Sequence, residues 1–108
     1  MTPLEIPIIA DVPLFEIRTT LDGREFLLLF DWNDRESRWY LSIESINHEQ
    51  LARGIKLLSN RPLLRKKVDP RLPSGSLVAI DTTETGVPAG FADLGSRVRL
   101  IYFEVGNG

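Results

Sequence analysis

Apolar and polar side chains alternate with a period of two along much of this chain. The clearest case is the segment 38–44, in which every second side chain is apolar: Trp39, Leu41 and Ile43. Successive side chains of a strand point to opposite faces of its sheet, so this segment is expected to bury one face. Because no segment shows a convincing long helical period, the pattern predicts an all-β protein.

The same pattern sets the expected strands. Strands are predicted at Leu14–Thr20, Glu25–Asp31, Arg38–Glu44, Leu51–Leu58, Ser76–Thr82 and Ser96–Val105. The pair Asp22-Gly23 between the first two favours a tight hairpin turn, because both residues tolerate a positive φ. The five apolar residues of Phe26–Phe30 indicate a central strand that is buried on both faces.

The fourth predicted strand is the least regular. Strict alternation places Leu51, Arg53, Ile55 and Leu57 on one face, and a short helix at Ile46–Arg53 is the competing interpretation. In the last strand, Val98, Leu100 and Tyr102 are expected on one face and Arg97 and Arg99 on the other. There, either ion pairs at the rim or apolar stems that lie along the sheet surface explain the two arginines.

Two proline- and glycine-containing segments, Ser59–Ser74 and Thr83–Asp93, are predicted to be long loops, the first with a short extended piece around Leu63–Val68. Residues 1–13 contain three prolines and are expected to form an extended arm able to pack on a neighbouring chain; the domain then spans 14–105, and 106–108 form a frayed tail. The fold class expected is a small single-domain antiparallel β-barrel or sandwich of about six strands with two long loops.

Length and composition narrow the class of protein. A chain of 108 residues with 43% hydrophobic residues is long enough for one core. It contains no Cys, which excludes disulfides and thiolate metal sites. The longest apolar run has five residues, whereas a membrane helix needs about 20, so we expect a soluble chain without a membrane partner.

Charge is distributed unevenly. The segment from Arg53 to Arg71 contains seven basic residues and one acidic residue, which gives it a net charge of +6. The rest of the chain has six basic and fourteen acidic residues and a net charge of −8. Such polarity steers acidic partners. The basic stretch has no aromatic residue for stacking on bases, so a nucleic-acid partner is not expected.

Few residues are candidates for chemistry. His48 is the single histidine and is expected to be a solvated turn residue. Asp31, Asp34 and Glu36 lack the spacing of a calcium loop, so no metal site is predicted. With no nucleotide-binding or nucleophile motif, we predict no catalytic residue, no cofactor and no enzyme activity.

Three aromatic residues, Trp32, Trp39 and Tyr40, are candidates for a stacking platform for a sugar or a base. Trp39 shares a face with Leu41 and Ile43, which favours a place in the core. For Trp32 and Tyr40 the pattern favours neither the core nor the surface.

A set of short motifs resembles the plug family of contractile-phage baseplates of the cyanophage type. The motifs are Trp32-Asn33-Asp34-Arg35, Arg38-Trp39-Tyr40-Leu41, Arg53-Gly54-Ile55-Lys56-Leu57, Pro62-Leu63-Leu64, Gly75-Ser76-Leu77-Val78-Ala79-Ile80-Asp81 and the stretch from Asp93 to Tyr102. Each is weak alone, but their order and spacing are specific. The resemblance covers about Phe15 to Glu104 and leaves out the N-terminal arm.

The resemblance implies a structural protein at the baseplate hub of a contractile tail, which closes the lumen of the tail tube until DNA ejection. Its partners would be the hub and tail spike proteins of the same phage, with the tape-measure protein as a further candidate. It would be located in the virion after assembly in the host bacterial cytoplasm. The alternatives are an OB-like module for single-stranded nucleic acid and a carbohydrate-binding β module.

The basic loop is where we expect contact with the hub. Its cations would orient the plug and its leucines would anchor it. The interface residues predicted are Arg61, Leu63, Leu64, Arg65, Lys66, Lys67 and Arg71.

Overall fold

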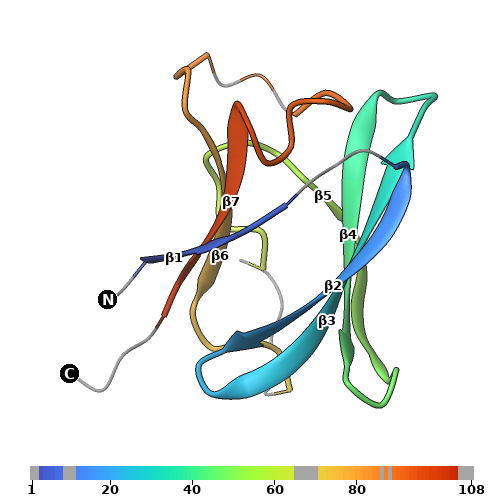
Figure 1. The fold of residues 1–108 in the computed structure, drawn as a ribbon, viewed down its shortest axis with the longest axis vertical. Coiled ribbons are helices and arrows are strands. Elements are labelled where there is room, and N and C mark those ends of the chain that lie inside the picture. The colour runs from blue at the N-terminus through green and yellow to red at the C-terminus, as the bar shows by residue number, and fades with distance from the viewer. Residues whose placement is uncertain (1–2, 9–11, 65–70, 86, 88, 105–108) are drawn as a thin grey trace.

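Two antiparallel sheets face each other in the computed structural model, which describes residues 3–8, 12–64, 71–85, 87 and 89–104 (Figure 1). The strands are β1 (Pro3–Ile6), β2 (Leu14–Leu21), β3 (Arg24–Asn33), β4 (Arg38–Ser45), β5 (Gln50–Lys56), β6 (Ser76–Asp81) and β7 (Val98–Phe103). One sheet has the order β1-β7-β6 and the other β2-β3-β4-β5. The all-β prediction is confirmed, and the sheets form a sandwich rather than a closed barrel. Across the described residues, no helix is long and apolar enough to span a membrane.

The β2–β3 hairpin forms as the sequence predicts. Asp22 and Gly23 have φ angles of 52° and 79°, the positive values that a two-residue hairpin turn of this kind requires. In β3 the core face is formed by Phe26, Leu28 and Phe30, all at most 2% exposed. Leu27, on the other face, is also buried at 5% exposure, so the central strand is covered on both sides there.

The register of β5 corrects the strict alternation predicted for this strand. Leu41 of β4 lies opposite Ile55 and Ile43 lies opposite Ala52, so three steps along β5 match two along β4. This is a β-bulge, and Gly54 supports it with a φ of +68°. The extra residue places Ala52 in the core and leaves Arg53 exposed, where alternation had placed Arg53 beside Ile55. The competing helix at 46–53 is not formed.

The three-stranded sheet begins in the segment expected to be an N-terminal arm. Residues 3–6 are extended and pair antiparallel with β7 of the same chain, with Pro3 opposite Phe103. Pro3 is tolerated because it stands at the first position of an edge strand, where a missing N–H donor matters least. Ile6 and Ile8 enter the core at 2% and 8% exposure.

Polar contacts close the sandwich at the end where the β2–β3 turn lies. The Tyr102 hydroxyl donates to Oδ2 of Asp22 in that turn and accepts from the Gly75 N–H at 2.6 Å. Arg24 Nη2 donates to the Leu72 carbonyl at 2.7 Å. Burial is the main reason that the Tyr102 pKa is raised to about 12, and the Asp22 carboxylate adds to it. These contacts hold the two sheets in one orientation around their shared core.

Candidate docking surface

The start of the basic loop runs beside β6. Asn60 N–H donates to the Ala79 carbonyl at 2.6 Å and Leu63 N–H to the Leu77 carbonyl at 2.8 Å. Leu64 belongs to the core at 9% exposure, and Leu63 is half-buried against that core. The two leucines therefore hold the loop to the domain itself, while Arg61 stays exposed.

Part of the positive charge of this region is neutralised locally. Arg71 forms an ion pair with Glu49 at 2.7 Å, and Lys56 lies 3.9 Å from Glu36. Both carboxylates come from turns of the four-stranded sheet, outside the basic stretch, so a count along that stretch does not include them. Among the predicted interface residues, Arg65, Lys66 and Lys67 lie outside the described residues.

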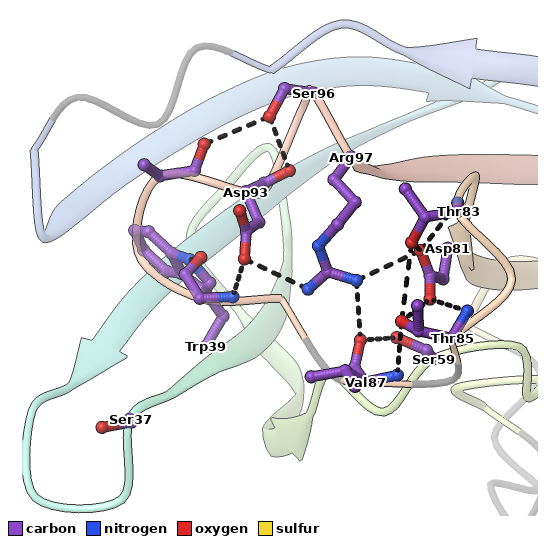
Figure 2. Close-up of polar contacts among 12 residues, drawn as sticks. Ser37, Trp39, Ser59, Asp81, Thr83, Thr85, Val87, Asp93, Ser96 and Arg97 are labelled. Carbon is purple, nitrogen blue, oxygen red and sulfur yellow. Dashed lines mark hydrogen bonds and ion pairs between the residues drawn. The ribbon is translucent and has the colours of Figure 1, made fainter.

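The loop between β6 and β7 is organised by one buried carboxylate, Asp81, whose side chain has no exposed surface (Figure 2). Its Oδ1 accepts from the N–H and hydroxyl of Thr83 at 2.9 and 2.6 Å. Its Oδ2 accepts from the N–H and hydroxyl of Thr85 at 2.8 and 2.6 Å. The carboxylate thus fixes the first turn of the loop with four hydrogen bonds.

Arg97 joins the two ends of this loop. Its guanidinium contacts Asp81 Oδ1 and Asp93 Oδ2, each at 3.1 Å, and donates to the Val87 carbonyl, also at 3.1 Å (Figure 2). The Gly90 N–H, together with Arg97, holds the pKa of Asp93 below its ordinary value. The ion pairs that explain Arg97 and Arg99 from the sequence are present, since Arg99 lies 3.4 Å from Glu5.

The two long loops touch each other. The Ser59 hydroxyl donates to the Val87 carbonyl at 3.1 Å (Figure 2). Asn60 Oδ1 accepts from the Asp81 N–H at 3.2 Å. Arg61 follows directly, and Val87 is 54% exposed. At this surface the two predicted loops are in direct contact through Ser59 and Val87.

The β6–β7 loop also contributes Phe91 to an aromatic cluster with Trp32 and Trp39. Phe91, 36% exposed, stacks on Trp39 with centroids 5.6 Å apart and meets Trp32 edge-on at 5.6 Å. Trp39 is fully buried and donates from Nε1 to the Gly90 carbonyl at 3.2 Å, which confirms its predicted place in the core. The proposed platform of three exposed aromatic side chains is therefore not formed.

Tyr40 lines an open groove of about 600 Å³ on the outer face of the four-stranded sheet. The residues around it are Asp31, Trp32, Asn33, Tyr40, Ser42, Gln50, Arg53 and Gly54. The Tyr40 hydroxyl donates to Glu36, whose carboxylate is the main reason that the Tyr40 pKa is raised. Lys56 lies over the Tyr40 ring at 6.0 Å. Tyr40 thus has partners of its own within the chain.

Two of the acidic residues considered as cation ligands have hydrogen-bond partners within the chain. Asp34 accepts a hydrogen bond from Trp32 Nε1 at 3.3 Å, and Glu36 is engaged by Tyr40. Within the described ranges, the acidic and histidine side chains that gather within 4.8 Å are instead Glu16, Glu44 and His48. His48 is exposed, with Nδ1 3.2 Å from Glu44, and it lies in the β4–β5 turn with a φ of 64°.

Sequence reasoning missed two features of the loops. It placed Asp81 at the end of a strand without a role, although an Asp at the start of a turn commonly accepts a hydrogen bond from the backbone N–H two residues ahead. It also did not foresee the contact between Ser59 and Val87, because neither segment has a regular period.

A family model described as "Cyanophage baseplate Pam3 plug gp18" matches residues 4–105 of the chain. The match extends the resemblance seen in the motifs to β1, and it covers both long loops. Comparison with curated proteins gave no match.

Proposed function

Because the chain belongs to this family of cyanophage baseplate plug proteins, we propose that it is a structural component of a contractile phage tail, seated at the baseplate hub and closing the lumen of the tail tube until DNA is ejected. The observation that carries the proposal is the extent of the match, which takes in both sheets and the loops between them. The baseplate of the phage virion is accordingly its location, and assembly in the host bacterial cytoplasm is part of the proposal.

A structural role agrees with the chemistry of the surface. The buried carboxylate Asp81 accepts four hydrogen bonds from Thr83 and Thr85 and so serves the folding of a loop. The family is named for a plug, not for a reaction. We therefore propose that the chain acts by shape and contact and is not an enzyme.

Contact with the hub is proposed through the basic loop, with the hub and spike proteins as partners and the tape-measure protein as a third candidate. Arg61 is exposed, and among the described residues no carboxylate lies within ion-pair distance of it. Arg65, Lys66 and Lys67 follow in the same loop. Rim charges of this kind set orientation and association rate more than affinity.

The test is co-expression of the tagged chain with the hub and spike proteins encoded beside it, followed by sizing at moderate salt. The variants are Lys66→Glu with Lys67→Glu, and separately Arg61→Glu. Arg35→Glu is the matched control, because Arg35 is an exposed cation in the distant β3–β4 turn. We expect the first two variants to recover less of the hub than the wild type, the control to recover as much, and all three to retain the thermal midpoint of the wild type.

Two results would overturn the proposal. Unaltered recovery of the hub with both loop variants would exclude the basic loop as the docking element. A wild-type chain that binds neither hub nor spike, yet retains single-stranded DNA or cell-wall sugars, would favour a binding module in place of a plug.

A further inference from the structure

β2 is an edge strand whose outer side has no partner in the described part of the chain. Trp32 N–H donates to the Pro13 carbonyl at 2.8 Å, and hydrogen-bonded pairs alternate along an antiparallel ladder. The backbone groups of Leu14, Glu16, Arg18 and Thr20 therefore point away from β3. All four residues are exposed.

The other edges of the two sheets are protected. β5 carries the bulge at Gly54, β1 is only four residues long and starts with Pro3, and β6 is covered by residues 59–63. Shortening, bulges, prolines, covering segments and charged side chains are the usual devices that prevent a sheet from adding strands. β2 has eight residues in continuous register with β3, and of these devices it carries only charges, Glu16 and Arg18, which are of opposite sign. It is the edge that this fold leaves open for pairing.

We propose that β2 pairs antiparallel with β2 of a second copy of the chain, with Ile17 of each copy at the two-fold axis. In this register Glu16 lies directly opposite Arg18 of the second copy, and Arg18 opposite the second copy's Glu16. Both pairs lie on the outer face and both join backbone groups that point outward. The interface is isologous, so each complementary contact occurs twice.

The charges select this register over its neighbours. Backbone hydrogen bonds between the two copies require residues with outward-pointing backbone groups to lie opposite each other. These residues are Leu14, Glu16, Arg18 and Thr20, so the register between the copies can shift only by exchanging one of them for another as the residue opposite. A shift in one direction places Glu16 opposite Glu16 of the second copy. A shift in the other places Arg18 opposite Arg18 of the second copy. Like charges directly opposite destabilise a pair of strands, so the Ile17-centred register is favoured.

The surroundings of Glu16 and the inner face of β2 both favour a second copy of the chain as the partner. Oxygens of Glu16 and Glu44 lie within 4.8 Å of each other and of a ring nitrogen of the exposed His48, and among the described residues no Lys or Arg forms an ion pair with Glu16. An arginine from a second copy would supply that cation. Arg18 already pairs with Glu25 at 2.8 Å and has donors left for a second carboxylate. On the inner face, the half-buried Ile17 would meet its own counterpart.

Charge exchange tests the register directly. The single variants Glu16→Arg and Arg18→Glu each place like charges opposite each other, whereas the double variant Glu16→Arg with Arg18→Glu restores both pairs. In sedimentation equilibrium of the isolated chain, we expect the wild type to dimerise and each single variant to raise the dimer Kd by at least about tenfold. The double variant should return within about threefold of the wild type. Glu84→Arg, an exposed loop charge, is the matched control and should leave the Kd unchanged.

Three outcomes would overturn the proposal: a wild type that stays monomeric up to about 1 mM, single variants that dimerise like the wild type, or a double variant as weak as the singles. Thermal melts of each variant establish that the fold is kept. Because the experiment uses the chain alone, its result is independent of whether the chain docks on a hub.

Discussion

The two sheets of the sandwich are assembled in different ways. In the four-stranded sheet, β2 to β5 follow each other in chain order and each strand reaches the next through a short turn. The three-stranded sheet pairs β1 from the start of the chain with β7 near its end, and residues 82–97 separate β6 from β7 (Figure 1). The first sheet depends on local contacts and the second on contacts between distant segments.

The two sheets also differ in what fixes their connections. The β2–β3 turn of the four-stranded sheet is flanked by an exposed ion pair, Arg18 with Glu25, which contributes little to stability. The β6–β7 loop is held by a buried carboxylate and the arginine that faces it. A long connection has more conformational freedom to lose, so it needs specific internal contacts where a two-residue turn needs only the right backbone angles.

The largest effects are expected in the central strand of each sheet. Leu28 in β3 and Leu100 in β7 are both fully buried, so Leu28→Ala and Leu100→Ala should each lower the free energy of unfolding by about 3 kcal/mol. Their kinetics should differ. If the local sheet forms first, Leu28→Ala will mainly slow refolding and Leu100→Ala will mainly accelerate unfolding.

Stopped-flow refolding and unfolding of the two variants across denaturant concentrations checks this pair. Equal slowing of refolding in both variants would mean that the two sheets form together, and that chain order does not decide which is first.

A smaller effect is expected from the buried carboxylate of the β6–β7 loop. Asp81→Ala removes the acceptor of four hydrogen bonds and one of the carboxylates that face Arg97, which keeps Asp93 and the Val87 carbonyl. We expect a loss of about 2 kcal/mol, because Arg97 keeps these partners and is partly exposed. Chemical denaturation measures the loss, and hydrogen exchange should show faster exchange at Thr83 and Thr85 than in β2–β5. Unchanged exchange at these amides would contradict the role given to Asp81.

The same contrast explains what the sequence could predict. The Asp22-Gly23 turn and the alternation around Trp39 and Leu41 are local signals, and both led to correct strands. β1 was expected only as an extended arm, because prolines such as Pro3 and Pro7 are unusual in strands. Its partner, β7, also lies at the other end of the chain, where a local pattern does not show it. The bulge in β5 breaks the period on which the prediction depended.

The candidate docking surface could likewise be predicted only in part. The run of basic residues in the sequence identified the basic loop, and the exposure of Arg61 agrees with a position of this loop at the surface. It did not show that Leu64 belongs to the core or that Glu49 pairs with Arg71, since burial and ion pairing across sheets are not visible in a local pattern. The contact between the two loops at Ser59 and Val87 is likewise a product of the tertiary fold.

The contact between the sheets through Tyr102 gives a prediction with a pH dependence. Tyr102→Phe removes the acceptor of the Gly75 N–H and the donor to Asp22, and should cost about 1–2 kcal/mol at neutral pH. The Tyr102 pKa is raised to about 12 in the folded protein, so this contribution is complete below the ordinary value of 10.0 and is lost as the pH rises toward 12. The difference between wild type and variant should therefore shrink in alkali. A gap in urea midpoints that stays constant over this range would contradict the assignment.

The smallest effect is expected at the far end of the β6–β7 loop. The Gly90 N–H and Arg97 hold the Asp93 pKa below its ordinary value of 3.8, so Asp93 stabilises the fold above that value and loses its contribution as the pH falls through the lowered one. Asp93 is 38% exposed, so water weakens its pairing with Arg97 relative to that of Asp81. Asp93→Asn should lower the thermal midpoint slightly at neutral pH and converge with the wild type in acid. If the two midpoints agree at every pH, Asp81 is the carboxylate that fixes Arg97, and the long connection is held at its first turn rather than at both ends.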